Sequence, residues 1–355
     1  MATTKVTTDV IDMSGNTGGL VWAKGTTAQR PAVGVSTIGD LRENTETFRT
    51  EVYNNSGAWR NLKEVPVSVA VDFLVVAGGG GGGFDDAGGG GAGGLRTSFG
   101  SATGGGVTPA ESSKTLSLSI SYAIDVGVGG TGGQSTPTKG GNSTFADIIS
   151  DGGGAGMQVS GALQDGGSGA GGTGNSVDQS PGTATIGQGF DGGNGHPRLS
   201  NNEAGGGGGG AAVAGTAASP NTGGAGGAGL EVQITGTTGL TATYAGGGGG
   251  GGRTTGGAGG IGGGAAGTGA ANPSNAPANQ GGGGGTSGAN SGSFSGSNGG
   301  SGIIILRCTK ATATIGAGVT VNGISAAGSV NGVSITGTSD YYYSATLGTG
   351  TITFS

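Results

Sequence analysis

Residues 73–83 read Phe-Leu-Val-Val-Ala-Gly-Gly-Gly-Gly-Gly-Gly, so an aliphatic run passes directly into six consecutive glycines. The order is reversed at residues 299–306, where Gly-Gly-Ser-Gly precedes Ile-Ile-Ile-Leu. Further unbroken glycine runs lie between these two points, at 88–91, 205–210, 246–252 and 281–285. A flexible low-complexity chain, the alternative that composition allows, has no need of aliphatic strands joined to its glycines. The pattern therefore favours an ordered glycine structure.

Glycine can adopt the polyproline-II helix, which has three residues per turn and rises ~3.1 Å per residue. Unlike proline, glycine keeps its N–H group, and without a side chain it lets neighbouring helices exchange hydrogen bonds on three faces. Ordering one residue costs ~1–2 kcal/mol of backbone entropy, whereas one hydrogen bond returns only ~0.5–1.5 kcal/mol. A single glycine helix would therefore be unstable, and the sequence predicts a lattice of many parallel polyglycine-II segments.

Composition excludes several other classes of protein. Glycine accounts for 96 of the 355 residues, and 81 of these glycines lie between residues 77 and 302. A collagen triple helix requires glycine at every third position and abundant proline, but the chain has nine prolines and no such period. Its net charge of −6 argues against nucleic-acid binding. The most apolar stretch, residues 65–77, is short and contains Asp72, so we expect no membrane insertion.

We expect a mainly β and irregular fold with almost no α-helix, in three parts. These are a β-rich module at residues 1–70, a polyglycine-II sandwich at 71–307 and a region of β-hairpins at 308–355. Apolar residues alternate from Leu116 to Val128, which predicts one half-buried strand.

Turn signals complete the expected strand map. Asn54-Asn55-Ser56-Gly57 predicts a hairpin between residues 51–53 and 59–62. Asn322-Gly323 and Asn331-Gly332 predict type I′ turns, in which both residues adopt positive φ. Residues 351–354 predict a last strand.

The N-terminal part resembles a short module of bacteriophage tail-fibre proteins. The resemblance rests on Gly25-Thr26-Thr27-Ala28-Gln29-Arg30-Pro31, Gly39-Asp40-Leu41-Arg42-Glu43-Asn44-Thr45, Glu51-Val52-Tyr53 and Trp59. In that family such modules are β-rich and usually trimeric. The resemblance implies a homotrimer that attaches to another phage tail or fibre protein, with a monomeric tip on a separate fibre as the alternative.

The glycine-rich part resembles the receptor-binding domain of phage tail-fibre tip adhesins. The shared features are an aliphatic strand before a glycine run, Val126-Gly127-Val128-Gly129-Gly130, Tyr244-Ala245 before a glycine run, and Gly300-Ser301-Gly302-Ile303-Ile304-Ile305. In that family connecting loops on a polyglycine-II sandwich bind host receptors. The resemblance implies a virion protein, extracellular after host lysis, that recognises an outer-membrane protein or a surface glycan. A structural fibre or matrix protein is the rival class.

Catalytic chemistry is not visible in the sequence. His196 is the only histidine, and no nucleophile elbow accompanies it, so we expect no serine-hydrolase triad. Ligands for a zinc site are too few, and the aspartates do not follow the calcium-binding repeat. We expect no enzyme, no metal and no cofactor.

Receptor recognition needs exposed side chains between the glycine runs, and aromatic residues and arginine are the usual interface anchors. One preferred surface combines two loops, and a tyrosine run near the C-terminus is the second candidate, with strand packing as its alternative. The candidate residues are Phe84, Asp85, Asp86, Phe99, Phe190, Asp191, His196, Arg198, Tyr341, Tyr342 and Tyr343.

Overall fold

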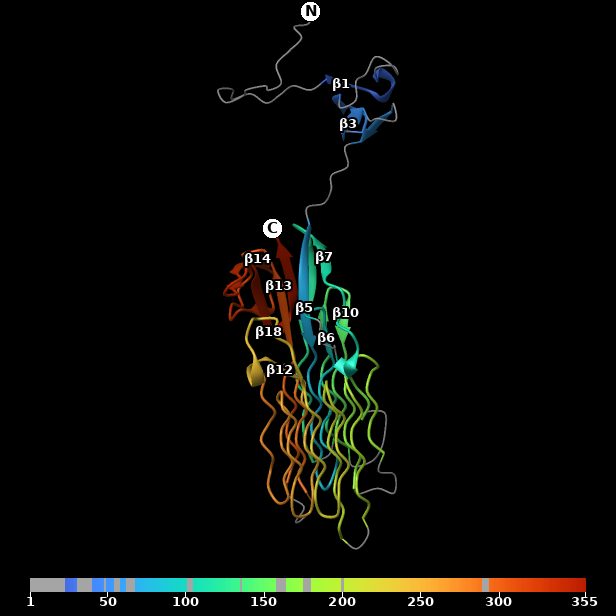
Figure 1. Cartoon of the computed structure of the whole chain (residues 1–355), viewed down its shortest axis with the longest axis vertical. Coiled ribbons are helices and arrows are strands. Elements are labelled where there is room, and N and C mark those ends of the chain that lie inside the picture. The colour runs from blue at the N-terminus through green and yellow to red at the C-terminus, as the bar shows by residue number, and fades with distance from the viewer. Residues whose placement is uncertain are drawn as a thin grey trace, which may run out of the picture. The chain divides into compact units, whose positions relative to one another are not determined.

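The computed structural model describes residues 23–30, 40–47, 49–53, 58–61, 68–100, 105–134, 136–157, 164–174, 180–198, 201–288 and 294–355. Backbone contacts divide the chain into two compact units, residues 1–66 and 67–355 (Figure 1). The described residues contain strands and extended segments, with three short 3-10 turns at Thr27–Gln29, Gly105–Val107 and Gly239–Ala242 and no α-helix. This confirms the expected fold class. The turn expected at residues 54–57 lies outside the described residues.

The first unit contains a four-stranded sheet of β1 (Ala23–Gly25), β2 (Leu41–Asn44), β3 (Arg49–Tyr53) and β4 (Trp59–Asn61). β1 runs parallel to β2, and the other neighbours are antiparallel. Tyr53 lies opposite Trp59, which confirms the expected pairing of these two strands. Among the described residues of this unit, Tyr53 is the only large apolar side chain that is buried.

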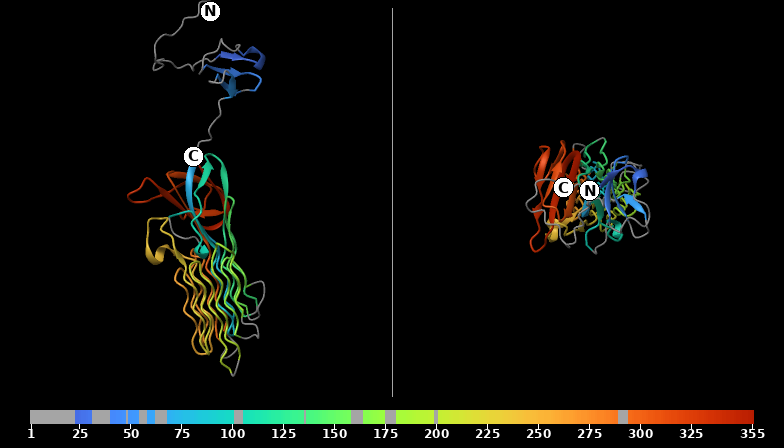
Figure 2. Two further views of the ribbon diagram at one scale, coloured as in Figure 1. Left: turned by 45° about the vertical axis from the view of Figure 1, so that its right-hand side comes forward. Right: turned by 90° about the horizontal axis from the view of Figure 1, so that it is seen from above.

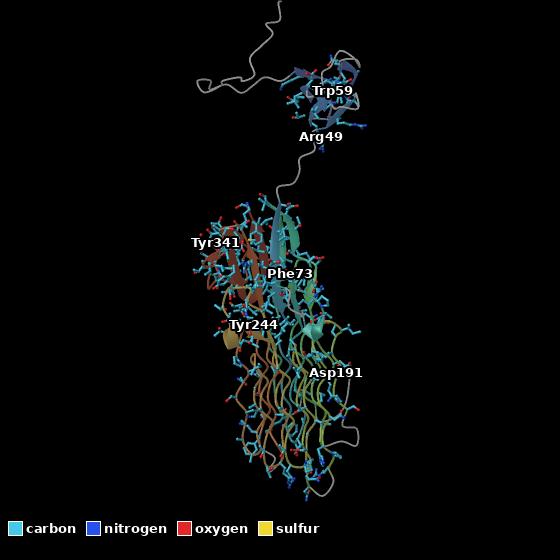
Figure 3. All side chains as sticks on the ribbon, viewed as in Figure 1. Arg49, Trp59, Phe73, Asp191, Tyr244 and Tyr341 are labelled. Carbon is cyan, nitrogen blue, oxygen red and sulfur yellow. The ribbon has the colours of Figure 1, made fainter. Side chains whose placement is uncertain are left out.

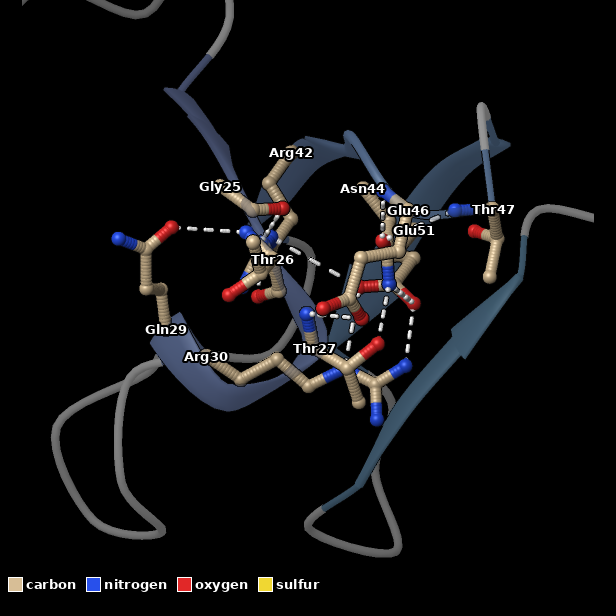
Figure 4. A network of polar contacts seen from close by, with 10 residues as sticks. All are labelled: Gly25, Thr26, Thr27, Gln29, Arg30, Arg42, Asn44, Glu46, Thr47 and Glu51. Atoms are coloured by element: carbon tan, nitrogen blue, oxygen red, sulfur yellow. Dashed lines mark hydrogen bonds and ion pairs between the residues drawn. The ribbon is translucent and has the colours of Figure 1, made fainter.

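A buried polar network takes the place of an apolar core in this unit (Figure 4). Glu51 is fully buried, forms an ion pair with Arg30 and accepts a hydrogen bond from Asn44 Nδ2 (2.9 Å). Arg42, also buried, donates to the carbonyls of Gly25 and Thr26. Its guanidinium group lies 5.7 Å from the centroid of the Trp59 ring. Five of the residues that carry the tail-fibre resemblance, Arg30, Arg42, Asn44, Glu51 and Trp59, therefore meet in one network.

We expect acid to unfold the first unit. The hydrogen bond from Arg30, followed by that from Asn44, holds the pKa of Glu51 below its usual value in the folded state. The unfolded chain therefore binds the proton more tightly, so this stabilisation is complete above an unfolded pKa of ~4.3 and is lost at lower pH. Tryptophan fluorescence reports on this unit, because Trp22 and Trp59 both belong to it. Urea midpoints that do not change between about pH 7 and about pH 3 would contradict the expectation.

The second unit begins with a twelve-stranded sheet whose main path runs β10-β9-β8-β18-β13-β5-β6. Its strands are β5 (Ser68–Val76), β6 (Leu95–Thr97), β7 (Lys114–Ser117), β8 (Ser121–Val126), β9 (Ser143–Phe145), β10 (Ile148–Ser150), β13 (Ile303–Cys308), β14 (Thr312–Ile315), β15 (Val319–Val321), β16 (Gly328–Asn331), β17 (Val333–Ser334) and β18 (Tyr341–Phe354). A separate short pair consists of β11 (Leu230–Glu231) and β12 (Thr243–Tyr244).

Both faces are buried from Phe73 to Val76 in β5 and from Ile303 to Leu306 in β13, which explains why these parts of the two strands are continuously apolar. Phe73, Val75 and Leu306 face one apolar cluster. Leu74 and Ile305 face another. Residues 308–355 share this sheet, because β18 pairs with both β13 and β8. The C-terminal segment and the glycine-rich segment therefore lie in one compact unit.

Two of the strand predictions are wrong. The alternating segment from Leu116 onward forms two strands, because Ser119 has φ +60° and reverses the chain between β7 and β8. β7 pairs with β5 and β8 with β18, and Ile120 in the turn is 52% exposed. The last strand is also longer than expected, because β18 begins at Tyr341 and contacts several partners in turn.

The two Asn-Gly pairs behave differently. Asn322 and Gly323 have φ +48° and +79°, and the flanking residues exchange two backbone hydrogen bonds, which confirms this turn. The second pair, at residues 331–332, is not a type I′ turn. Gly332 lies between β16 and β17, which pair with different strands, and packs closely against the Tyr341 and Tyr343 side chains.

The glycine segments run side by side from the sheet, as Figure 2 shows. In the run 78–83, residues three apart donate hydrogen bonds to the same neighbour, as a threefold helix requires. Amides of residues 78 and 81 donate to carbonyls 141 and 138, those of 79 and 82 to 300 and 297, and that of 80 to 91, at 2.9–3.0 Å.

The carbonyls of the same run bind three other segments. They accept from amides of residues 153 and 156, 130 and 133, and 284. The run therefore has six neighbouring segments, of which three accept hydrogen bonds from its amides and three donate hydrogen bonds to its carbonyls. The run is buried throughout, and none of its glycines has positive φ.

The run 246–252 has the same surroundings. Its amides donate in period three to residues 262–265, 224–227 and 87–90, and its carbonyls accept from 283–286, 257–260 and 205–208. The expected polyglycine-II lattice is therefore present, with its long glycine runs in the interior.

Candidate functional site

One end of the glycine lattice adjoins the sheet, and turns gather at the other. Backbone contacts hold the turns at this other end together. Asp86 donates its amide to Ser287 O (3.3 Å) and accepts from the Gly174 amide (2.9 Å), while Ala204 pairs with Gly252. We call this end, with its turns at residues 84–87, 201–203, 219–222, 253–255 and 268–275, the loop end (lower part of Figure 1).

Three turns of the loop end are bonded to one another through Asn221. Its amide donates to Asn202 O (3.0 Å), and its carbonyl accepts from the amides of Thr254 (3.0 Å) and Thr255 (3.2 Å). Asn221 has φ +62°, a conformation that asparagine adopts more readily than most residues. We call residues 201–202, 219–222 and 254–255 the Asn221 surface. Its turns are fixed by backbone bonds above a rigid lattice.

A buried carboxylate lies beside this surface. Glu203 is 1% exposed, and its Oε1 accepts a hydrogen bond from Arg253 Nη1 (2.9 Å). Arg198 Nε lies 3.7 Å from the same oxygen. The two arginines lie far apart in the sequence, so the carboxylate of Glu203 links Arg198 to the turn at 253–255. Removing both arginines would leave the buried carboxylate without a charge partner, which is costly.

Comparison with known proteins places the chain in a family. A family model described as "Glycine-rich domain" matches residues 55–309, which is most of the chain. The chain belongs to this glycine-rich domain family. No curated protein and no solved structure matches the chain. The match ends one residue after β13, so β14–β18 complete the sheet of the glycine-rich domain from outside the matched range.

The structure brings five of the eleven sequence-predicted residues together at the loop end of the glycine-rich domain. Phe84, Asp85 and His196 are half-buried there, and Arg198 is exposed. Asp86 is fully buried. His196 pairs through its backbone with Ala204 and thereby anchors the turn that carries Arg198.

The other loop residues lie elsewhere. Phe190 exchanges backbone bonds with Gly169 and Gly210, close to the sheet. Asp191 lies on the flank of the lattice, where its Oδ1 accepts from the Ala184 amide at 2.7 Å (Figure 3). Phe99 packs beneath the guanidinium group of Arg307, 4.7 Å from the ring centroid. The preferred two-loop surface is therefore not continuous, because Phe190 and Asp191 are away from Phe84.

The tyrosine run forms the start of β18 rather than a loop. Tyr343 is buried, and its hydroxyl donates to Lys310 O (2.8 Å). Burial raises the pKa of Tyr343 above its ordinary value. Tyr341 packs against one core cluster and Tyr342 against the other. Strand packing, the alternative for this run, is what the structure shows.

Sequence reasoning missed Glu203 and Asn221. Glu203 is a single glutamate before a glycine run, which is the pattern of a solvated turn residue. The one local signal is that it directly precedes residues 204–210, where a lattice segment begins. Pro220-Asn221 is an ordinary turn signal. That Asn221 joins three turns depends on segments far apart in the sequence.

Two negative findings concern the described residues alone. They contain no group of three or more His, Cys, Asp or Glu side chains arranged to hold a metal ion. They also contain no helix with the length and apolar character needed to cross a membrane.

Proposed function

We propose that this protein is the receptor-binding protein of a bacteriophage tail fibre, carried on the virion, and that its loop end contacts a receptor on the host surface. It would be a binding protein, not an enzyme. The first unit would trimerise and attach to another tail or fibre protein, and light scattering on the full chain distinguishes a trimer from a monomer.

The observation that carries this proposal is the gathering of turns at one end of a lattice whose long interior runs consist of glycine and so display no side chains. Lattice glycines cannot encode specificity, since an added Cβ at Gly249 would lie 2.1 Å from Gly257 O. Turns can vary at little structural cost, and a rigid support limits the entropy lost on binding. The network of Arg30, Arg42 and Glu51 supports the tail-fibre likeness of the first unit.

The test is adsorption of the purified full chain to a panel of bacterial strains, with competition against phage attachment. Binding to a strain together with blocked attachment supports the adhesin. If the chain binds no strain and blocks no phage, the rival function, a structural fibre or matrix protein, replaces it.

A matched pair of phenylalanines tests where binding occurs. Phe84 and Phe190 are both half-buried, but only Phe84 lies at the loop end. We expect Phe84→Ala to weaken adsorption by roughly tenfold or more, as interface anchors do, and Phe190→Ala to leave it unchanged. Adsorption isotherms on a susceptible strain measure both. Equal affinities for Phe84→Ala and the parent protein would exclude the turn at 84–87 from the site.

A further inference from the structure

The exposed side chains of the Asn221 surface share one chemistry. Asn201, Ser219, Thr254 and Thr255 are exposed, and all carry amide or hydroxyl groups. An amide offers both donors and acceptors, and a hydroxyl can act as either. Such a set matches the hydroxyl groups of a sugar, which also both donate and accept.

Charge lies beside the surface rather than on it. Arg253 pairs with the buried carboxylate of Glu203, and the exposed Arg198 has its Nε 3.7 Å from the same oxygen, so one carboxylate faces two guanidinium groups. The side chains of the Asn221 surface itself are uncharged. Recognition here therefore depends on short-range hydrogen bonds rather than on long-range electrostatic attraction.

Two of the anchors typical of protein–protein interfaces, tryptophan and tyrosine, are absent from the turns of the Asn221 surface. Such interfaces are enriched in tryptophan and tyrosine and depleted in serine. Neither tryptophan nor tyrosine occurs between Tyr122 and Tyr244, or between Tyr244 and Tyr341. Short Ser, Thr and Asn side chains on fixed turns also lose little conformational freedom when they bind.

We infer that the Asn221 surface binds a neutral, hydroxyl-rich surface glycan. The inference rests on the proposed function and deepens it by naming the class of receptor. A neutral sugar presents several hydroxyl groups in fixed positions. The three bonded turns likewise hold hydroxyl and amide groups in fixed positions, where they can hydrogen-bond to the sugar.

The experiment uses the full chain and a strain to which it adsorbs. Binding is measured to the purified surface polysaccharide of that strain and, separately, to vesicles that contain its outer-membrane proteins without polysaccharide. The double variant Ser219→Ala/Thr255→Val removes two exposed hydroxyls and leaves the backbone hydrogen bonds of Asn221 in place. Thr136→Val, at an exposed threonine in another turn, is the control.

We expect the polysaccharide to bind, the double variant to bind it about tenfold more weakly, and the control to match the parent protein. An unchanged melting temperature of the double variant shows that it remains folded. Binding to the protein vesicles alone, or equal polysaccharide binding by the double variant, would overturn the glycan assignment while leaving the adhesin intact. If the chain adsorbs to no strain, the proposed function fails first and the inference with it.

Discussion

Gly249→Val is expected to unfold the second unit. Gly249 lies in an interior lattice segment with neighbours on all sides, and a Cβ there would approach Gly257 O to 2.1 Å and Gly267 N to 2.6 Å. Overpacking in an ordinary core costs ~1–3 kcal/mol because side chains can shift. Here the obstacles are backbone atoms hydrogen-bonded to further segments, so relief would require breaking the lattice. The expected loss is therefore larger than that range.

Near-UV circular dichroism of tyrosine measures this unfolding, because five of the six tyrosines belong to the second unit. Gly133→Val is the matched control, since a Cβ at Gly133 meets nothing within 4 Å and the residue has no positive φ. We expect the control to melt with the parent protein. A Gly249→Val protein with the parent melting temperature would show that the interior can admit side chains.

Glu51→Ala is expected to unfold the first unit while the second stays folded. Glu51 is the carboxylate that the buried network shares, and its removal leaves Arg30 and Arg42 without their charge partner. Breaking a buried pair in this way costs ~3–5 kcal/mol. The unit buries little apolar surface, so it has little other stability to offset this loss.

Glu43→Ala makes the same chemical change on the neighbouring strand. Glu43 pairs with Lys24 at 2.8 Å, but both side chains are substantially exposed, and such pairs contribute ~0–1 kcal/mol. Tryptophan fluorescence during urea unfolding compares the two variants. Equal midpoints for Glu51→Ala and Glu43→Ala would show that the network does not hold the unit together.

Most of the lattice could be predicted from the sequence. Glycine has no side chain, so glycine runs that recur between aliphatic strands predict closely packed polyglycine-II segments. The runs at 78–83 and 246–252 are interior segments as expected. Strand lengths were harder to predict. Period-two alternation continues through Ser119, where positive φ reverses the chain, and alternation carries no information about φ.

The loop end was predictable only in part. Phe84 and Arg198 were predictable as candidates because they are bulky residues between glycine runs, and both lie at the loop end. Phe190 is also a phenylalanine between glycine runs, but it lies near the sheet. Its position depends on which lattice segment pairs with which, and glycine segments have no side chains to specify their neighbours. Contacts such as Glu203 with Arg253 follow from that arrangement and have no local signal in the sequence.

Amide hydrogen exchange at the interior glycines tests the central claim, that the glycine runs form a hydrogen-bonded polyglycine-II lattice, most directly. The amides of residues 205–210 and 246–251 all donate to neighbouring segments. We predict that these amides exchange only through opening of the whole unit, with protection equal to that of β5 and β13. Rapid exchange throughout both runs, in protein whose β5 and β13 amides remain protected, would contradict the lattice.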